Sequence, residues 1–357
     1  MKIAIILGTR PEIIKLSPII RHLKNNKGNF FIIHTNQHYS YEMDKIFLNE
    51  LNLPKSNYNL KLNNTKNHGE MVGKMMIEIE KILIQEKPDL VIVQGDTNTT
   101  LAGALTGSKL GIKIAHIEAG LRSYDRSMPE EINRVITDHL SDFLFCPTKN
   151  QKKILINEGI DKNKIFVVGN TIVDAIFENI KIAEKNKKLV EKYKNTKYFL
   201  LTLHRPSNVD NKERLEKIIK ILEKLVYIYK IPIIFPIHPR TKINLKKFNI
   251  NIDKKKIKII NPLGYLEMLL TEKYAQIILT DSGGLQEEAC ILKVPCLTLR
   301  YNTERPETIK VGANILVGNE EKKLLEGIKA MLNKKRNWKN PYGEKVYQKV
   351  LFFIENK

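Results

Sequence analysis

The sequence predicts an α/β protein built from two doubly wound, Rossmann-like domains that face each other across a cleft. Short runs rich in Ile, Val and Leu alternate with amphipathic helical patterns along the whole chain, which is typical of parallel β/α folds. The length of 357 residues exceeds that of one ordinary domain. A stretch rich in Lys, Glu and Asn at residues 181–197 separates two series of such runs, so each domain is expected to hold its own sheet.

The apolar runs mark the expected strands. Most of them lack polar alternation, as parallel strands do when helices cover both faces of a sheet. They are residues 3–7, 30–34, 90–94, 113–117, 143–147 and 165–169 in the first series, and 198–203, 232–237, 256–260, 276–280, 295–299 and 314–317 in the second. We predict an N-terminal domain over 1–170, completed by a C-terminal helix within 342–357, and a second domain over 171–341.

Composition excludes several classes of function. No apolar run approaches the roughly 20 residues that cross a bilayer, and residues 1–7 do not form a signal peptide, so we expect a cytoplasmic protein without a membrane partner. Cys146, Cys290 and Cys296 lack the spacing of a zinc site, and we expect no metal site. The net charge of +21 raises the alternative of nucleic-acid binding. The excess is mostly lysine scattered over helix faces and loops, so we expect no nucleic-acid partner.

The first candidate motif is Gly-Thr-Arg-Pro-Glu at residues 8–12, directly after the first expected strand. Glycine permits a tight turn, Pro11 suits the start of a helix, and the N–H groups of a helix N-terminus attract anions. Arg10 and Lys15 are both placed to reach a diphosphate bound there. The G-x-G-x-x-G spacing of a dinucleotide site is absent, so no nicotinamide cofactor is expected. The alternative is an ordinary β/α turn with a surface arginine.

Acidic residues stand at strand ends and at one helix start in the first half. Asp96 follows the run at 90–94 and is a candidate either for acid/base chemistry or for the N-cap of the next helix. Glu118 stands at the mouth of a buried strand, where no secondary-structure preference explains a carboxylate. Glu130 opens a helix together with Glu131. The helix dipole alone favours acids there, so function and structure stay open for Glu130, and Glu131 is expected to be structural.

The second half repeats this arrangement at two strand ends. His204 and Arg205 follow one apolar run, and this pair of residue types at a strand end is a candidate for binding or catalysis. The Ser-Gly-Gly sequence at 282–284 follows the run at 276–280 and opens a helix, so its N–H groups and hydroxyl form a cradle for a diphosphate. Glu288, about one turn into that helix, is placed to accept hydrogen bonds from ribose hydroxyls. The alternative is a glycine-rich connector.

Together the candidate motifs contain an anion-binding turn in each half, several carboxylates and a histidine, with Arg300 and Arg305 near the second turn. The sequence shows no metal cluster, nucleophile elbow or Walker lysine. This combination suits acid/base chemistry on an anionic sugar nucleotide. A sensor that binds a nucleotide sugar without turnover is the alternative from another class.

In series, the motifs resemble the non-hydrolysing UDP-N-acetylglucosamine 2-epimerases, whose fold is that of the two-domain GT-B glycosyltransferases. The matching segments are, in chain order, GTRPEIIKLSP, QGDTNTT, HIEAGLRS, MPEEINR, FVVGNTIVD, LTLHR, LTDSGGLQEEA and NTERPE, and they cover essentially the whole chain. The resemblance implies a homodimer without a cofactor that interconverts UDP-N-acetylglucosamine and UDP-N-acetylmannosamine. That reaction supplies precursors for surface polysaccharide or glycan synthesis.

By matching motif positions, the resemblance also implies roles for individual residues. Catalytic roles fall on Asp96, Glu118, Glu130 and His204. Substrate contacts fall on Arg10, Lys15, Asp96, Glu118, His204, Leu263, Met268, Ser282, Gly283, Gly284, Glu288 and Arg305, with Leu263 and Met268 on the uracil side. The first domain is thus expected to carry the acid/base residues, and the second to bind the nucleotide.

Two segments depart from the family pattern. After Arg205 this chain has Pro-Ser-Asn at 206–208, where many members carry a further acid, so a role borrowed from that acid does not transfer. Residues 37–42 differ from the form found in members that a second UDP-N-acetylglucosamine molecule regulates. We therefore do not assume that regulation.

The mechanism that the resemblance implies agrees with the chemistry of the residues. The C2 proton of the sugar is not next to a carbonyl, so UDP leaves first, and the positive charge that develops acidifies C2–H and gives 2-acetamidoglucal. A diphosphate clamp stabilises the leaving group, and carboxylates transfer the protons, with Glu118 or Asp96 as the expected base. Alternatives that use the same fold are a hydrolysing epimerase, an epimerase for a diacetamido uronic acid sugar, and a glycosyltransferase.

Overall fold

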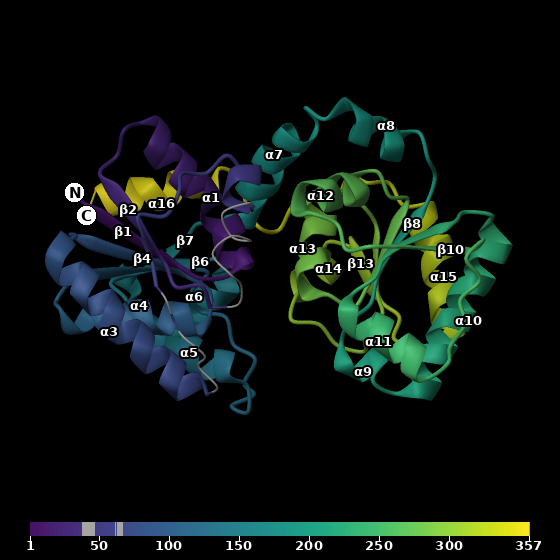
Figure 1. The fold of residues 1–357 in the computed structure, drawn as a ribbon, viewed down its shortest axis with the longest axis horizontal. Coiled ribbons are helices and arrows are strands. Elements are labelled where there is room, and N and C mark those ends of the chain that lie inside the picture. Colours follow the sequence, from purple (N-terminus) through teal and green to yellow (C-terminus); the bar gives the residue numbers. More distant parts are fainter. Residues whose placement is uncertain (38–46, 61, 63–66, 357) are drawn as a thin grey trace. The chain divides into compact units, whose positions relative to one another are not determined.

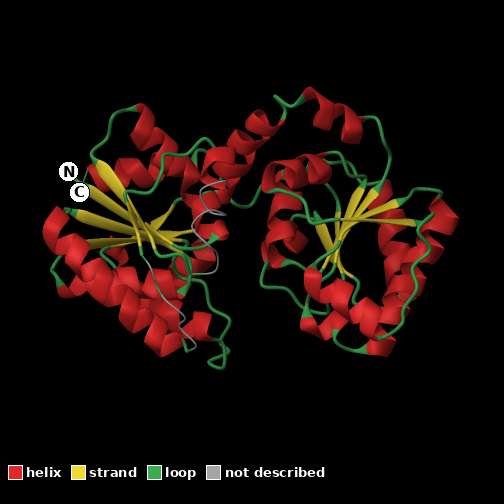
Figure 2. Cartoon of the chain, in the orientation of Figure 1, coloured by secondary structure: helices red, strands yellow, loops and turns green. Residues whose placement is uncertain are grey.

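The computed structural model describes residues 1–37, 47–60, 62 and 67–356. The chain divides into two compact units, Met1–Glu178 with Tyr342–Lys357, and Asn179–Pro341 (Figure 1). The division falls inside helix α7 (Ile172–Ala183), later than the boundary expected after residue 170. In each unit a parallel sheet lies between layers of helices (Figure 2). Residues 38–42, part of the segment that departs from the family pattern, lie outside the described part of the chain.

The first unit holds a seven-stranded parallel sheet in the order β3-β2-β1-β4-β5-β6-β7. Its strands are β1 (Ile3–Leu7), β2 (Phe30–His34), β3 (Tyr58–Asn59), β4 (Leu90–Gln94), β5 (Lys113–Ile117), β6 (Phe143–Cys146) and β7 (Ile165–Val167). Apolar side chains fill both faces of the central strands, as Ile5, Ile6 and Leu7 show by being fully buried. Burial on both faces explains why these strands read as continuous apolar runs.

Helices cover both faces of this sheet. They are α1 (Arg10–Asn25), α3 (His68–Glu86), α4 (Asn98–Lys109), α5 (Pro129–Leu140), α6 (Lys149–Asn157), α7 and α16 (Val346–Glu355), with a 3-10 turn at Lys162–Lys164. One core cluster joins Ile6, Ile33 and Val93 of the sheet to Met75 and Ile79 of α3. Helix α16 contacts α1, so the end of the chain completes the first unit (Figure 1).

The second unit holds a six-stranded parallel sheet in the order β10-β9-β8-β11-β12-β13. Its strands are β8 (Phe199–Thr202), β9 (Ile233–Pro236), β10 (Ile257–Ile260), β11 (Ile277–Thr280), β12 (Cys296–Thr298) and β13 (Asn314–Leu316). Its helices are α8 (Lys187–Lys194), α9 (Pro206–Val209), α10 (Lys212–Tyr229), α11 (Pro239–Lys247), α12 (Tyr265–Lys273), α13 (Gly283–Ile291), α14 (Pro306–Lys310) and α15 (Glu321–Leu332). The larger apolar clusters of its core include Leu222 and Ile328 of α10 and α15 in one, and Leu270 and Ala289 of α12 and α13 in another.

The strand order reverses once in each sheet, and the candidate motifs follow the strands at these two points. Strand β1 lies between β2 and β4, and β8 lies between β9 and β11. In open parallel sheets, the crevice outside the carboxyl ends of the strands at such a point is the usual ligand site. Residues 8–12 and Asp96 follow β1 and β4, while His204 and residues 282–284 follow β8 and β11. The topology therefore gives each unit its own candidate ligand-binding edge.

The predicted fold class, α/β with two doubly wound parallel sheets, is confirmed. Each predicted apolar run contains an observed strand. Strand β3 was not predicted, because its two residues, Tyr58 and Asn59, form no apolar run. Among the described residues, no helix is both long and apolar enough to cross a membrane.

Candidate active site

Glu12 ties the turn after β1 to the turn after β4. It stands three residues after Thr9, the N-cap of α1, and its Oε2 accepts hydrogen bonds from the backbone N–H groups of Gly8 (2.9 Å) and Thr9 (2.7 Å). Its Oε1 accepts from the hydroxyls of Thr97 (2.6 Å) and Thr100 (3.1 Å). Burial raises the pKa of Glu12, and these hydrogen bonds, that of Thr97 foremost, oppose the rise. The Thr-x-x-Glu spacing signals this capping role, which was not drawn from the sequence.

Glu118 lies at the carboxyl end of β5 and faces Lys15 of α1. Its Oε2 accepts hydrogen bonds from Nζ of Lys15 and Nε2 of Gln94, both at 2.5 Å, and its Oε1 accepts one from Nδ2 of Asn170 at 3.2 Å. The side chain is only 5% exposed, and the φ angle of +73° lies in the left-handed region that few non-glycine residues adopt. Three donors therefore fix this carboxylate, and the charge of Lys15 offsets the cost of burying it.

Arg10 and Lys15 both belong to α1, but their side chains contact different residues. The guanidinium of Arg10 lies 5.3 Å from the ring centre of Phe47, a cation–π distance. The ammonium of Lys15 pairs with Glu118 instead. Both cations were expected to bind a diphosphate. The charge of Lys15 instead lies beside Glu118, the carboxylate that was expected to act as a base.

Asp96 follows β4, but it is not the N-cap of α4. That position belongs to Thr97, whose Oγ1 accepts a hydrogen bond from the backbone N–H of Thr100 at 3.2 Å. The N-cap alternative for Asp96 is therefore wrong. Its carboxylate pairs with the guanidinium of Arg134 of α5, and Asn133 donates a hydrogen bond to its carbonyl oxygen at 3.0 Å. The Asp96 side chain is still 32% exposed, so a ligand has access to it.

A buried charged network lies behind the turn that carries Asp96. The ring of His116 in β5 has Nδ1 2.7 Å from Oδ1 of Asp138 and Nε2 2.8 Å from the carbonyl oxygen of Gly95. Both ring nitrogens of His116 therefore lie within hydrogen-bonding distance of an oxygen. Arg122 donates to the other Asp138 oxygen at 2.7 Å. This network fixes the carbonyl next to Asp96, a role for His116 that the sequence did not suggest.

The two acids at the start of α5 differ in burial and in contacts. Glu131 is buried and accepts hydrogen bonds from N and Oγ of Ser123 and from N of Tyr124, each at 2.9 Å, and from Arg134 at 2.6 Å. Burial acts to raise the pKa of Glu131, but the Ser123 and Tyr124 hydrogen bonds and the Arg134 charge lower it overall. Glu130 is exposed and has no hydrogen-bonding partner among the described residues. Glu131 therefore has the structural role expected for it, and Glu130 stays open to a ligand.

In the second unit, Asp281 organises the turn after β8. Its fully buried carboxylate accepts hydrogen bonds from the backbone N–H groups of His204 (3.0 Å) and Arg205 (2.9 Å) and from Nδ2 of Asn208 (3.1 Å). Oδ1 of Asp281 also lies 3.2 Å from Nδ1 of His204. Burial acts to raise the Asp281 pKa, but the contacts with His204, Arg205 and Asn208 lower it overall. The imidazole of His204 is therefore oriented by a carboxylate that is itself held in place.

The imidazole of His204 also packs on a second imidazole. Its ring centre lies 5.4 Å from that of His238, which precedes α11. Burial lowers the pKa of His238, and the charge of His204 lowers it further. A histidine that resists protonation thus stands next to His204.

Residues 282–284 begin α13 in the form expected for an anion cradle. Ser282 is the N-cap, and its side chain makes no capping hydrogen bond. A Cβ at Gly284 would meet nothing closer than Oγ of Ser282 at 4.0 Å, and a Cβ at Gly283 would meet only Oε2 of Glu304 at 3.6 Å. Packing within the chain therefore does not require these glycines. They leave the N-terminal N–H groups of α13 accessible, as an anion-binding turn needs.

Two arginines follow β12 near this turn. Arg300 holds Glu304 through two hydrogen bonds of 2.9 and 2.8 Å, and this contact lowers the pKa of Glu304 to about 2. An anionic carboxylate therefore stands beside Gly283 at the start of α13. Arg305, the N-cap of α14, has Nε 2.9 Å from Oε1 of the buried Glu287. The unit thus gathers guanidinium groups beside an accessible helix N-terminus.

The remaining predicted contacts lie on α12 and α13. Leu263 precedes Gly264, the N-cap of α12, and is half-buried, while Met268 of α12 packs against the core. Glu288 lies in the second turn of α13 and is also half-buried. Across the described ranges, no group of three or more His, Cys, Asp or Glu side chains is arranged to hold a metal ion.

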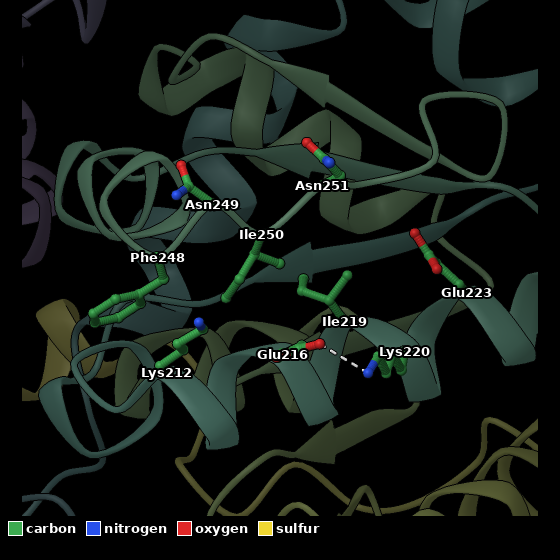
Figure 3. Close-up of a pocket in the computed structure, with 9 residues that line it drawn as sticks. All are labelled: Lys212, Glu216, Ile219, Lys220, Glu223, Phe248, Asn249, Ile250 and Asn251. Atoms are coloured by element: carbon green, nitrogen blue, oxygen red, sulfur yellow. Dashed lines mark ion pairs between the residues drawn. The ribbon is translucent and has the colours of Figure 1, made fainter.

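A hollow elsewhere in the second unit contains none of the predicted site residues (Figure 3). Its walls come from α10 and from the chain after α11: Lys212, Glu216, Ile219, Lys220, Glu223, Phe248, Asn249, Ile250 and Asn251. Within it, Glu216 and Lys220 form an ion pair of 2.8 Å. The hollow is not at the strand ends that carry the motifs, so it is not the candidate active site.

The two edges differ in the chemistry that they offer. The first unit presents the carboxylates of Glu118 and Asp96 at strand ends and the exposed Glu130, which together suit proton transfer. The second unit presents an accessible helix N-terminus with arginines near it, which suits the phosphates of a nucleotide. Acid/base groups and an anion site in one chain are what chemistry on a sugar nucleotide requires.

Comparison with known proteins also points to an enzyme that acts on a sugar nucleotide. The UDP-N-acetylglucosamine 2-epimerase family profile matches residues 21–351. The UDP-N-acetylglucosamine 2-epimerase of Methanocaldococcus jannaschii is 64% identical over 351 residues, which are 96% of this chain and 95% of that protein. The crystal structure of the M. jannaschii enzyme in complex with UDP-GlcNAc and UDP matches with 61% identity and a TM-score of 0.86 over 100% of both chains.

A more distant relative has the same fold. The Neisseria meningitidis UDP-GlcNAc 2-epimerase bound to UDP-GlcNAc matches with 32% identity and a TM-score of 0.88 over 100% of both chains. The GT-B fold that the resemblance implied is thereby confirmed. On the family profile, the full-length relatives and the shared fold, the chain belongs to the UDP-N-acetylglucosamine 2-epimerase family.

Proposed function

We propose that the protein interconverts UDP-N-acetylglucosamine and UDP-N-acetylmannosamine by eliminating and re-adding UDP. The observation that carries this proposal is the buried carboxylate of Glu118, which Lys15, Gln94 and Asn170 hold at the carboxyl end of β5. A fixed carboxylate at the carboxyl edge of the sheet, one strand from the switch point, suits the transfer of a proton to or from a bound sugar. The relatives support the substrate, since the M. jannaschii structure holds UDP-GlcNAc and UDP.

Elimination solves the chemical difficulty of this reaction. The C2–H bond of the sugar is not acidic while the anomeric oxygen stays bonded. As the bond between C1 and that oxygen breaks, UDP takes the electron pair, positive charge develops on the sugar, and C2 loses its proton to a base. The products are UDP and 2-acetamidoglucal. Re-addition of UDP at C1, with a proton delivered to the other face of C2, gives the manno epimer.

The candidate acid/base groups, which belong to the first unit except for His204, would move the protons. Glu118 or Asp96 is the base at C2, and Glu130 and His204 assist in returning a proton. Glu118 is fixed by three donors, whereas the Asp96 side chain is partly exposed. Proton transfer by positioned groups of this kind typically accelerates a reaction by roughly 10²–10⁴-fold.

Groups of the second unit would bind the nucleotide. The hydroxyl of Ser282, the N–H groups of Gly283 and Gly284 and the Arg305 guanidinium receive the diphosphate, and Arg10 is a further candidate contact. The N–H of Ser282 itself donates to the Thr280 hydroxyl at 2.9 Å. Glu288 accepts hydrogen bonds from the ribose, and Leu263 and Met268 lie beside the uracil. Stabilising the departing diphosphate is a large share of the catalysis, because negative charge develops there as the C1–O bond breaks. The reaction needs no cofactor.

The test is incubation of the protein with UDP-N-acetylglucosamine in deuterium oxide. We expect the manno epimer to form and deuterium to appear at C2 of both sugars, as NMR and mass spectrometry would show. Turnover without exchange at C2 contradicts elimination. Release of free N-acetylmannosamine with UDP would identify a hydrolysing epimerase instead.

Glu118→Gln supplies the matched control for the role of Glu118. The amide keeps the size of the side chain but cannot accept the C2 proton, so exchange and epimerisation should fall together while UDP still binds. Unchanged turnover would remove Glu118 from the chemistry. The proposal also includes a homodimer, which rests on the family resemblance, and a cytoplasmic location, which the three buried, unpaired cysteines support.

A further inference from the structure

Glu272 of α12 is a buried acid without an ordinary partner. Its side chain is fully buried, and neither carboxyl oxygen accepts a hydrogen bond from any N–H or O–H group of the described residues. The one side chain that hydrogen-bonds with it is that of Glu288, on the neighbouring helix α13. Acidic side chains are almost never fully buried unless they are paired, so this contact calls for a chemical explanation.

Two carboxyl groups attract each other only when they share a proton. Burial raises the pKa of Glu272 well above its usual value, and the charge and hydrogen bond of Glu288 raise it further. Burial and the neighbouring carboxylate therefore both favour the protonated, neutral form of Glu272. In that state Glu272 is a hydrogen-bond donor and Glu288 is the anionic acceptor.

The other titratable groups around Glu272 supply no positive charge. Tyr198, which precedes β8, and Cys296 of β12 face it, and burial raises the pKa of each, so both are neutral at pH 7. Helix α8 also packs on α12, but its Tyr193 donates to Glu267 instead. Within the described chain no lysine or arginine acts on Glu272. The shared proton is thus the interaction that makes the Glu272–Glu288 contact favourable.

The hydrogen bond with Glu272 acts on a residue of the candidate nucleotide site, Glu288. Glu288 is half-buried and lies on the helix that residues 282–284 begin, whereas Glu272 is completely enclosed. We propose that Glu272 is a positioning residue, a neutral carboxylic acid whose hydrogen bond orients the Glu288 carboxylate toward the ribose hydroxyls of the nucleotide. This inference rests on the proposed function, which assigns the ribose to Glu288.

Calorimetric titration of the full chain with UDP and with 2′,3′-dideoxy-UDP tests the role of Glu272. Glu272→Met fills the enclosed space with an apolar side chain that donates nothing, so we expect UDP to bind about tenfold more weakly, the effect of one hydrogen bond to a charged group. The affinity for the dideoxy nucleotide should equal that of the wild type, because this nucleotide lacks the ribose hydroxyls that donate hydrogen bonds to Glu288. Equal weakening of both nucleotides would show a purely structural effect and overturn the proposal.

Two further variants complete the design. Glu272→Gln keeps a donor, so UDP affinity should stay within about twofold of wild type; a loss as large as that of Glu272→Met contradicts the shared proton. Glu288→Ala should weaken UDP binding but not dideoxy-UDP binding, and adding Glu272→Met to it should change nothing more. If Glu288→Ala binds UDP normally, the ribose assignment fails and the proposal with it. Failure of the wild type to bind UDP would instead contradict the proposed function.

A pH series keeps the proposal testable if Glu272→Met does not fold. In the wild type, the preference for UDP over dideoxy-UDP should shrink as the pH rises into the range where Glu272 loses the proton that it donates. In Glu272→Gln the preference should stay constant over the same range, since the amide does not titrate. Parallel curves for the two proteins would overturn the proposal.

Discussion

The ammonium group of Lys15 lies 2.5 Å from Oε2 of Glu118, although the two residues are 103 positions apart in the chain. Their side chains are 15% and 5% exposed, so solvent screens the pair only slightly. The pairing connects α1 to the end of β5 and places positive charge at the carboxylate that is the candidate base. Lys15 therefore acts on the state of Glu118 whether or not it also touches a diphosphate.

Lys15→Met should show how much the ion pair with Glu118 contributes to stability. Removing one member of a buried ion pair leaves the other charge uncompensated, so we expect the free energy of unfolding to fall by about 3 kcal/mol. Adding Glu118→Gln should recover most of that loss, because no buried charge then remains. Urea denaturation of the four proteins measures the coupling. Losses that simply add would show that the pair contributes nothing to stability.

Glu130 and Glu131 form a natural pair for comparison, since they are adjacent and chemically identical. In Glu131→Gln, the amide NH₂ would face N–H groups that now donate hydrogen bonds to Glu131. The free energy of unfolding should therefore fall by about 2 kcal/mol. Glu130→Gln should change stability by less than about 0.5 kcal/mol, because its side chain is exposed. It should nevertheless slow C2 exchange by on the order of a hundredfold. Full turnover by Glu130→Gln would exclude Glu130 from proton transfer.

The sequence predicted the strands well because strands that are buried on both faces consist of continuous apolar residues, bounded here by polar segments. The candidate site residues at strand ends were recognisable for a related reason, since glycine, proline and charged residues there are local signals of ligand-binding turns. Strand β3 was missed because Tyr58 and Asn59 pair with β2 through backbone groups without any apolar pattern.

Long-range partners could not be predicted from the sequence. Glu12 reaches Thr97, and Lys15 reaches Glu118, only after the sheet has brought the ends of β1, β4 and β5 together. The Asp96 alternative failed because two adjacent residues were both suitable N-caps, and Thr97 took that position. Which of two such residues caps a helix depends on the tertiary partner of the other, here Arg134.

Gly284→Ala should affect binding without affecting the fold. The added methyl group would meet no atom of the chain closer than 4.0 Å, so thermal unfolding should be unchanged or slightly later. It would nevertheless stand in front of the N-terminal N–H groups of α13, and UDP affinity should fall at least about tenfold. Gly73→Ala in α3 is the matched control, because a Cβ there also meets nothing within 4 Å. It should raise stability by about 0.5–1 kcal/mol and leave UDP binding intact. Equal UDP affinity in the two variants would place the diphosphate elsewhere.

Asp281→Asn should remove a stabilising contribution that depends on pH. The pKa of Asp281 in the folded protein is lowered, so its carboxylate contributes fully above the unfolded value of about 3.9, and the contribution disappears as the pH falls through the folded value. The variant should therefore be less stable than the wild type by about 2 kcal/mol between pH 5 and 7, with the gap narrowing below pH about 4. Guanidinium denaturation of both proteins across this range measures the gap. A gap that widens in acid would mean that the carboxylate is not the group that holds the turns of His204 and Arg205 in place.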